Sequence, residues 1–128
     1  MRRCGIFRIL NFSTMTNKTV DTSQFKKYVL ENSAERPVLI DVRSKQEFEG
    51  QKLSHAINIP HDEIQKVFEL APDEFQQRVG IPKPQKGEPI VCFCTKGIRC
   101  AMACKTLEGL GYTNSRHLKD GLCCIEWD

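Results

Sequence analysis

The chain has 128 residues, of which 40% are hydrophobic, so it is long enough to bury one core and too short for two ordinary domains. Its 19 basic and 16 acidic side chains give a net charge of +3 without a dense basic tract, which argues against a nucleic-acid partner. No apolar run approaches the length of a membrane span, so we expect a soluble protein with no membrane contact.

The seven cysteines are odd in number and unevenly spaced. Cys92, Cys94, Cys100 and Cys104 crowd one segment, whereas a disulfide framework usually spreads its cysteines along the chain. We therefore expect an intracellular, reducing location, either mitochondrial or cytoplasmic. Metal ligands usually pair on turns, and these cysteines fall within a strand and a helix pattern, so we expect no metal and no other cofactor.

The first twenty residues have the composition of a mitochondrial transit peptide. Met1 to Val20 contains four basic residues and no acidic one, together with hydroxyl and apolar side chains. A simple N-terminal extension has the same composition, and both interpretations stay open. We expect an extension over residues 1–18, followed by a single domain over residues 19–128.

The remaining chain alternates between helix and strand patterns. In chain order, these patterns predict a helix over 21–32, a strand over 38–42, a helix over 45–49, a strand over 56–60, helices over 61–70 and 73–79, a strand over 91–93, a helix over 100–109 and a last strand within 112–118. The strand over 38–42 is continuously apolar, as strands covered on both faces are. The alternation predicts an α/β fold with a largely parallel sheet.

The loop that follows the strand over 91–93 carries the candidate chemistry. Cys94 opens this loop, in which consecutive backbone N–H groups point to one centre beside the positive end of a helix dipole. Lys96 and Arg99 add two cationic side chains. A thiol placed there ionises easily, so the pattern predicts a nucleophilic cysteine in an anion-binding loop. The alternative for a cysteine after a strand is a buried, inert thiol.

Taken together, these segments resemble the rhodanese (thiosulfate sulfurtransferase) family in its single-domain form. The resemblance covers about Thr19 to Trp127 and rests on residues 38–43, 47–48, 56–60, 94–99 and 110–114, with Gly121 and Trp127. It implies a rhodanese-like doubly wound five-stranded parallel sheet with helices on both faces. Trp127 corresponds to a packing position in the family.

The resemblance also implies roles for individual residues. Cys94 would accept the sulfur as a persulfide, and the anion would be bound by the loop residues Thr95, Lys96, Gly97, Ile98 and Arg99. Asp41 and Arg43 match a charged pair at the strand end, where Asp41 braces the structure and Arg43 approaches the site. Arg99 would either face the anion or lock the loop.

The implied activity is transfer of sulfane sulfur from thiosulfate or a persulfide donor to a small thiol, a protein thiol or cyanide. We expect a monomer. Related phosphatases and arsenate reductases place five residues between the cysteine and the arginine, whereas four separate Cys94 from Arg99 here. This shorter loop favours sulfur transfer over phosphate chemistry. A non-enzymatic rhodanese-like binding module is a further alternative.

The chain departs from the family pattern at three places. Gln51 to Ala56 stands where Gly-His-Ile-Pro-Gly-Ala is common, and Asp120 replaces the first glycine of a common Gly-Gly pair. Cys100 stands where serine is usual. It is either a packing residue or a thiol that resolves an oxidised or persulfidated Cys94.

Overall fold

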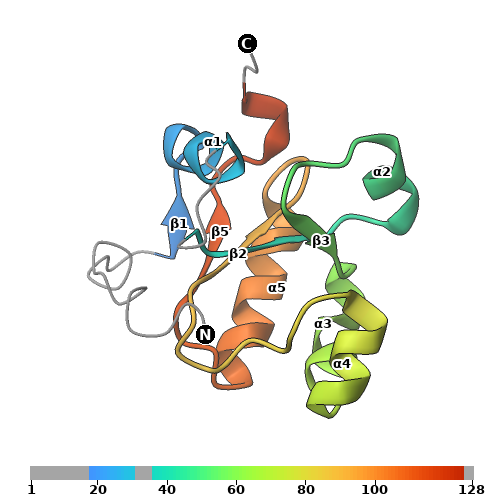
Figure 1. The fold of residues 1–128 in the computed structure, drawn as a ribbon. Coiled ribbons are helices and arrows are strands. Elements are labelled where there is room, and N and C mark those ends of the chain that lie inside the picture. The colour runs from blue at the N-terminus through green and yellow to red at the C-terminus, as the bar shows by residue number, and fades with distance from the viewer. Residues whose placement is uncertain (1–17, 31–35, 126–128) are drawn as a thin grey trace.

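The computed structural model describes residues 18–30 and 36–125, which form one five-stranded sheet flanked by helices (Figure 1). The strands are β1 (Thr19–Val20), β2 (Val38–Asp41), β3 (Ala56–Asn58), β4 (Ile90–Phe93) and β5 (Ser115–Leu118). Their order across the sheet is β1-β5-β4-β2-β3, and each neighbouring pair is parallel. The predicted five-stranded parallel sheet is therefore confirmed.

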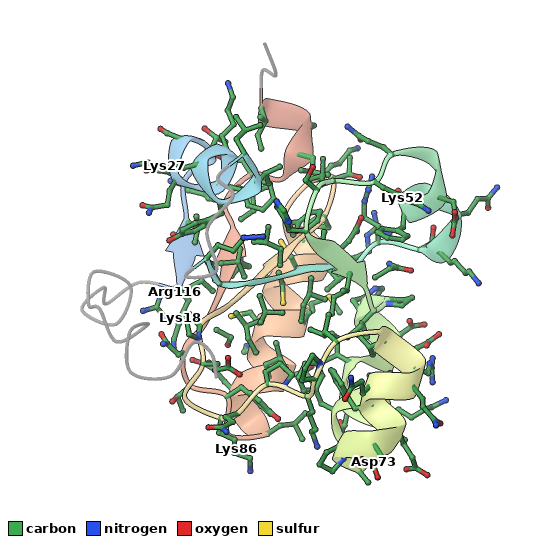
Figure 2. The ribbon with its side chains drawn as sticks, viewed as in Figure 1. Lys18, Lys27, Lys52, Asp73, Lys86 and Arg116 are labelled. Carbon is green, nitrogen blue, oxygen red and sulfur yellow. The ribbon has the colours of Figure 1, made fainter. Side chains whose placement is uncertain are left out.

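Helices cover both faces of this sheet (Figure 1). They are α1 (Thr22–Leu30), α2 (Lys45–Gly50), α3 (Ile64–Phe68), α4 (Pro72–Val79) and α5 (Ile98–Gly109), with 3-10 turns η1 (His61–Glu63) and η2 (Leu122–Cys124). Labelled charged side chains lie around the periphery of the molecule, among them Lys27, Lys52, Asp73 and Lys86 (Figure 2). No helix in the described ranges is long and apolar enough to cross a membrane.

The two faces of the central strands contribute side chains to two separate hydrophobic cores. Leu39, Val91 and Phe93 pack with α1 on one face, while Ile40 and Cys92 pack with α3, α4 and α5 on the other. Successive strand residues point to opposite faces, so a strand buried on both sides needs an unbroken apolar run. This requirement explains the pattern over residues 38–42.

Some predicted boundaries were wrong. β1 was not predicted, because a two-residue strand leaves no periodic pattern, and it forms by pairing with β5 at the sheet edge. α5 begins at Ile98 rather than at Cys100, directly after Gly97 in a left-handed conformation. The helix predicted from His61 starts as a 3-10 turn and ends at Phe68. Residues 1–17, 31–35 and 126–128, which include most of the predicted extension and Trp127, lie outside the described residues.

Candidate active site

The site lies where the neighbouring strands β2 and β4 end. Asp41 pairs with Phe93 in the parallel register, so the residues that follow the two strands leave the sheet at the same edge. Val42 extends this alignment, because its N–H donates to the Phe93 carbonyl at 3.0 Å. The arrangement places Cys94 beside the segment that carries Asp41 and Arg43, as crevices at the carboxyl ends of parallel strands do in open α/β sheets.

Cys94 sits in a cradle of backbone N–H groups. Its Sγ accepts from the Gly97 N–H at 3.1 Å and from the Cys100 N–H at 3.4 Å. Gly97 adopts φ +93°, a conformation that L side chains rarely take, and a Cβ there would lie 3.3 Å from the Asp120 backbone nitrogen. The turn of the loop back over the sulfur therefore requires glycine at this position.

The cradle stabilises the thiolate of Cys94. The pKa of this thiol is lowered from 9.0 to about 5, first by a hydrogen bond from the Cys100 side chain and then by the backbone N–H groups of Cys100, Gly97 and Arg99. Burial acts in the opposite direction, since only 1% of the Cys94 surface is exposed. The donors outweigh desolvation, so Cys94 is an anion at neutral pH.

The loop is shorter than the sequence pattern indicated. Thr95, Lys96 and Gly97 form it, whereas Ile98 and Arg99 already belong to the first turn of α5. Lys96 is exposed, and Ile98 is 69% exposed. Within residues 18–30 and 36–125, Lys96 forms no ion pair, so its positive charge can interact with an anion at the surface of the loop.

The side chain of Arg99 forms an ion pair with α2. Its guanidinium donates to Glu47 Oε1 at 2.8 Å and to Glu47 Oε2 at 3.3 Å. Glu47 is itself placed by a capping box with Ser44, in which each side chain bonds the other residue's backbone N–H. Hydrogen bonding from Arg99 is the first cause that lowers the pKa of Glu47 to about 2. This ion pair joins the first turn of α5 to α2, and both predicted roles of Arg99, facing the anion and locking the loop, stay predictions.

Asp41 and Arg43 form a buried ion pair, with Arg43 Nη2 2.7 Å from Asp41 Oδ2. The same guanidinium donates to the Gln51 carbonyl at 2.8 Å, and hydrogen bonding to Asp41 is the first cause that raises the Arg43 pKa. Asn58 Nδ2 donates to the backbone carbonyls of both residues, at 2.9 and 3.0 Å. The pair thus ties the end of β2 to the segment before β3, and among the described residues the Arg43 guanidinium donates to Asp41 and Gln51 rather than to Cys94.

A second segment, which follows β5, also supports the loop, and the sequence did not predict this role. The Leu122 N–H donates to the Cys94 carbonyl at 2.9 Å, and the Cys123 N–H donates to the Thr95 carbonyl at 3.0 Å. A Cβ at Gly121 would lie 2.2 Å from the Thr95 carbonyl oxygen. The signal for this role was Gly121 itself, since such a close approach of two backbones admits only glycine.

Cys92 and Cys104 are packing residues of the core. Cys92 is fully buried in β4, and Cys104 is 3% exposed on α5, where its Sγ lies 3.4 Å from the Ser115 carbonyl. Burial raises the pKa of both thiols. Among the described residues, no three or more His, Cys, Asp or Glu side chains are arranged to hold a metal ion.

Comparison with known proteins identifies this arrangement. The sequence model of the family described as "Rhodanese-like domain" matches residues 24–123. The chain belongs to the rhodanese-like family. The resemblance noted in the sequence is therefore confirmed at the level of family, and the described sheet and site lie almost entirely within the matched segment.

Curated relatives of this rhodanese-like chain include two thiosulfate:glutathione sulfurtransferases. The protein from Saccharomyces cerevisiae is 35% identical over 78 residues, which cover 61% of this chain and 56% of the relative. The human protein is 35% identical over 83 residues, covering 64% of this chain and 72% of the relative. The chain thus spans little more than half the length of the yeast relative.

A solved structure agrees with this fold over most of its length. The human single-domain sulfurtransferase has a TM-score of 0.76 with this chain at 28% identity, and the match covers 84% of this chain and 94% of the human one. Nearly the whole of the human domain therefore has an equivalent in the described fold.

Proposed function

We propose that this rhodanese-like protein is a sulfurtransferase that carries sulfane sulfur on Cys94. The observation that carries the proposal is the Cys94 thiolate, which is held by the Gly97 and Cys100 N–H groups with a pKa of about 5. A thiolate at the end of a central strand, surrounded by donors, is a nucleophile prepared for anionic or persulfide substrates.

The reaction has two displacements. The Cys94 thiolate attacks the outer sulfur of thiosulfate, the S–S bond breaks, and sulfite leaves with the electron pair. An acceptor thiolate or cyanide then attacks the outer sulfur of the Cys94 persulfide, and the Cys94 thiolate leaves. The same N–H groups stabilise Cys94 as the attacking group in the first step and as the leaving group in the second.

The surrounding residues hold this geometry. Lys96 attracts the anionic donor, and the backbone of Thr95 to Ile98 shapes the anion site. Arg99 fixes the start of α5 through Glu47, while Asp41 and Arg43 brace the adjoining strand end. Because 1% of Cys94 is exposed, a donor that delivers a single sulfur atom suits the site better than a bulky group.

The relatives support the choice of partners. Two of them are called thiosulfate:glutathione sulfurtransferases, so we propose thiosulfate or a persulfide as donor and a small thiol or protein thiol as acceptor. A fission-yeast relative, 32% identical over 109 residues, is called mitochondrial. We propose a monomer that acts inside the cell, in mitochondria or cytoplasm.

Mass spectrometry after incubation with thiosulfate tests the proposal. We expect one added sulfur atom, mapped to Cys94, and its loss on addition of cyanide or glutathione. Cys123→Ser is the matched control, because Cys123 is an exposed thiol close in space to the loop. The control should gain sulfur and Cys94→Ser should not. Equal uptake by Cys94→Ser would contradict the assignment, and absence of uptake by every protein would favour a binding module.

Aryl-phosphate hydrolysis tests the competing phosphatase reading. We expect hydrolysis to be negligible beside sulfur transfer. Hydrolysis of the aryl phosphate at a rate comparable to sulfur transfer would favour a phosphatase over a sulfurtransferase.

A further inference from the structure

Two large apolar side chains are exposed next to each other at the start of α5. Ile98 is 69% exposed and Met102 is 52% exposed, and their spacing of four residues places them on one face of the helix. Lys105, which is also exposed, continues this face one turn later. The buried residues of α5 lie on the opposite side, against the sheet. We call Ile98, Met102 and Lys105 the outer face of α5.

The outer face of α5 begins beside the reactive sulfur. Ile98 directly follows Gly97, whose N–H donates to Cys94 Sγ at 3.1 Å. Because only 1% of the Cys94 surface is exposed, an acceptor that takes its sulfur has to contact the loop closely, and the start of α5 is a surface that its flanking groups then meet. With a rise of 1.5 Å per residue, Met102 lies about 6 Å and Lys105 about 10 Å beyond Ile98 along the helix axis. A peptide can extend over these positions, whereas glutathione is too short to reach Lys105.

Positive charge borders the exposed apolar side chains. Lys96 and Lys105 are exposed, and neither forms an ion pair in the part of the chain that the structure describes. The other charged residues of α5 are paired, Arg99 with α2 and Glu108 with the residue before β1. Beside Gly97, the adjacent residues Lys119 and Asp120 carry opposite charges that offset each other. The surface around the outer face is therefore complementary to carboxylates.

We propose that the outer face of α5 binds a protein acceptor whose reactive cysteine lies in an acidic segment with apolar side chains. This inference rests on the proposed sulfur transfer and names the class of protein thiol that accepts the sulfur. Ile98 and Met102 lose exposed apolar surface when the segment binds, and Lys105 approaches its carboxylates. The partner thiolate then attacks the outer sulfur of the Cys94 persulfide, the S–S bond breaks, and its electron pair goes to Cys94 Sγ.

Two peptides and glutathione serve as acceptor probes. The acidic peptide has nine residues and blocked ends, with a central cysteine, a leucine on each side of it, two glutamates at each end and serines between. The basic peptide has lysines in place of the glutamates. The charged residues lie three and four positions from the cysteine, a span of about 10–14 Å in an extended chain, which is comparable with the reach of the outer face. The measurement is the rate constant for discharge of the Cys94 persulfide to each probe.

Two variants alter the outer face and leave the loop around Cys94 intact. Met102→Ser removes an apolar side chain, and Lys105→Glu reverses a charge. The matched controls are Leu30→Ser and Lys27→Glu, because Leu30 and Lys27 are exposed residues of α1, which packs on the other face of the sheet. For every probe, the rate constant of the variant is divided by that of the wild type, so the intrinsic reactivity of the probe's thiol cancels.

We expect Lys105→Glu to slow discharge to the acidic peptide about threefold or more and to speed discharge to the basic peptide, because repulsion replaces attraction. Both effects should shrink in about 1 M salt, where the Debye length is about 3 Å. Met102→Ser should slow discharge to both peptides about threefold through the loss of apolar contact. Discharge to glutathione, and every rate constant of the two controls, should stay within about twofold of the wild-type value.

Equal effects of Lys105→Glu on the two peptides would overturn the inference. Slowing of glutathione as strong as that of the acidic peptide would also overturn it, since the change would then act on the loop rather than on docking. If the wild-type protein takes up no sulfur, the proposed function fails, and the outer face is judged by binding alone. Labelled peptides with serine in place of the cysteine then show by fluorescence anisotropy whether the acidic peptide binds more tightly than the basic one and whether Lys105→Glu abolishes that difference; equal binding would refute the docking surface.

Discussion

Replacement of Gly121 by alanine should disrupt the loop that holds Cys94. Gly121 has φ +81° and ψ −179°, a combination that is essentially restricted to glycine. A Cβ at this position would lie 2.2 Å from the Thr95 carbonyl oxygen and 2.6 Å from the Lys96 nitrogen. Both neighbours are backbone atoms, so neither a rotamer change nor a flexible side chain can relieve the overlap.

The cost follows from these contacts. Ordinary van der Waals separation would require the two backbone segments to move apart by roughly 1 Å. The strained backbone contributes about 1–3 kcal/mol, and each of the hydrogen bonds from Leu122 and Cys123 to the loop contributes about 1 kcal/mol if it is lost. We therefore expect Gly121→Ala to lower the free energy of unfolding by about 3–5 kcal/mol. For a domain of this size, the midpoint of thermal unfolding should fall by roughly 10–20 °C.

Thermal and urea unfolding measure this change, with Gly109→Ala as the matched control. Gly109 ends α5 without a positive φ, and a Cβ there would meet nothing within 4 Å, so its replacement should change stability by less than about 1 kcal/mol. The alkylation pKa of Cys94 should also rise in Gly121→Ala, because the displaced loop no longer aims its N–H groups at the sulfur. Wild-type stability together with a wild-type Cys94 pKa would refute the reasoning.

Three further predictions concern single side chains. Alkylation of Cys94 should increase through a pKa of about 5 and stay level above about pH 7, whereas in denaturant it should follow the ordinary value of 9.0; a native transition near that value would contradict the cradle. Glu47→Gln should cost about 1 kcal/mol at neutral pH, after allowance for a side chain that is 39% exposed. In the folded protein the pKa of Glu47 lies below its ordinary value of 4.5, so the stabilisation is fully present above pH 4.5 and disappears as the pH falls toward about 2. Thermal unfolding should therefore show a smaller difference between wild type and Glu47→Gln at low pH than at neutral pH. Asp120→Gly should raise the free energy of unfolding by about 0.5–1 kcal/mol, since Asp120 has φ +67°, and a loss of stability in urea unfolding would argue against strain there.

The sequence alone determined the elements whose signals are local. The unbroken apolar run over residues 38–42 predicted a strand buried on both faces, because each face of that strand meets a different core. The order of strand, cysteine, short polar loop and helix predicted an N–H cradle around Cys94, since both donors, Gly97 and Cys100, follow Cys94 closely in the chain. The count of four residues between Cys94 and Arg99 predicted sulfur transfer rather than phosphate chemistry, and this stays a prediction for the aryl-phosphate assay.

Tertiary structure decided the features that depend on residues distant in the chain. Arg99 meets Glu47 because α2 and α5 start at the same edge of the sheet, although 52 positions separate the two residues. His55 occupies one of the family's glycine positions and keeps φ +70°, as the strand pairing that follows it outweighs its local preference. β1 forms by pairing with β5, which lies almost a hundred positions later in the chain. The hydrogen bonds from η2 to the Cys94 loop likewise join residues that are distant in the chain. Hydrogen bonds and close approaches of this kind leave no periodic pattern in a sequence, so only the assembled fold displays them.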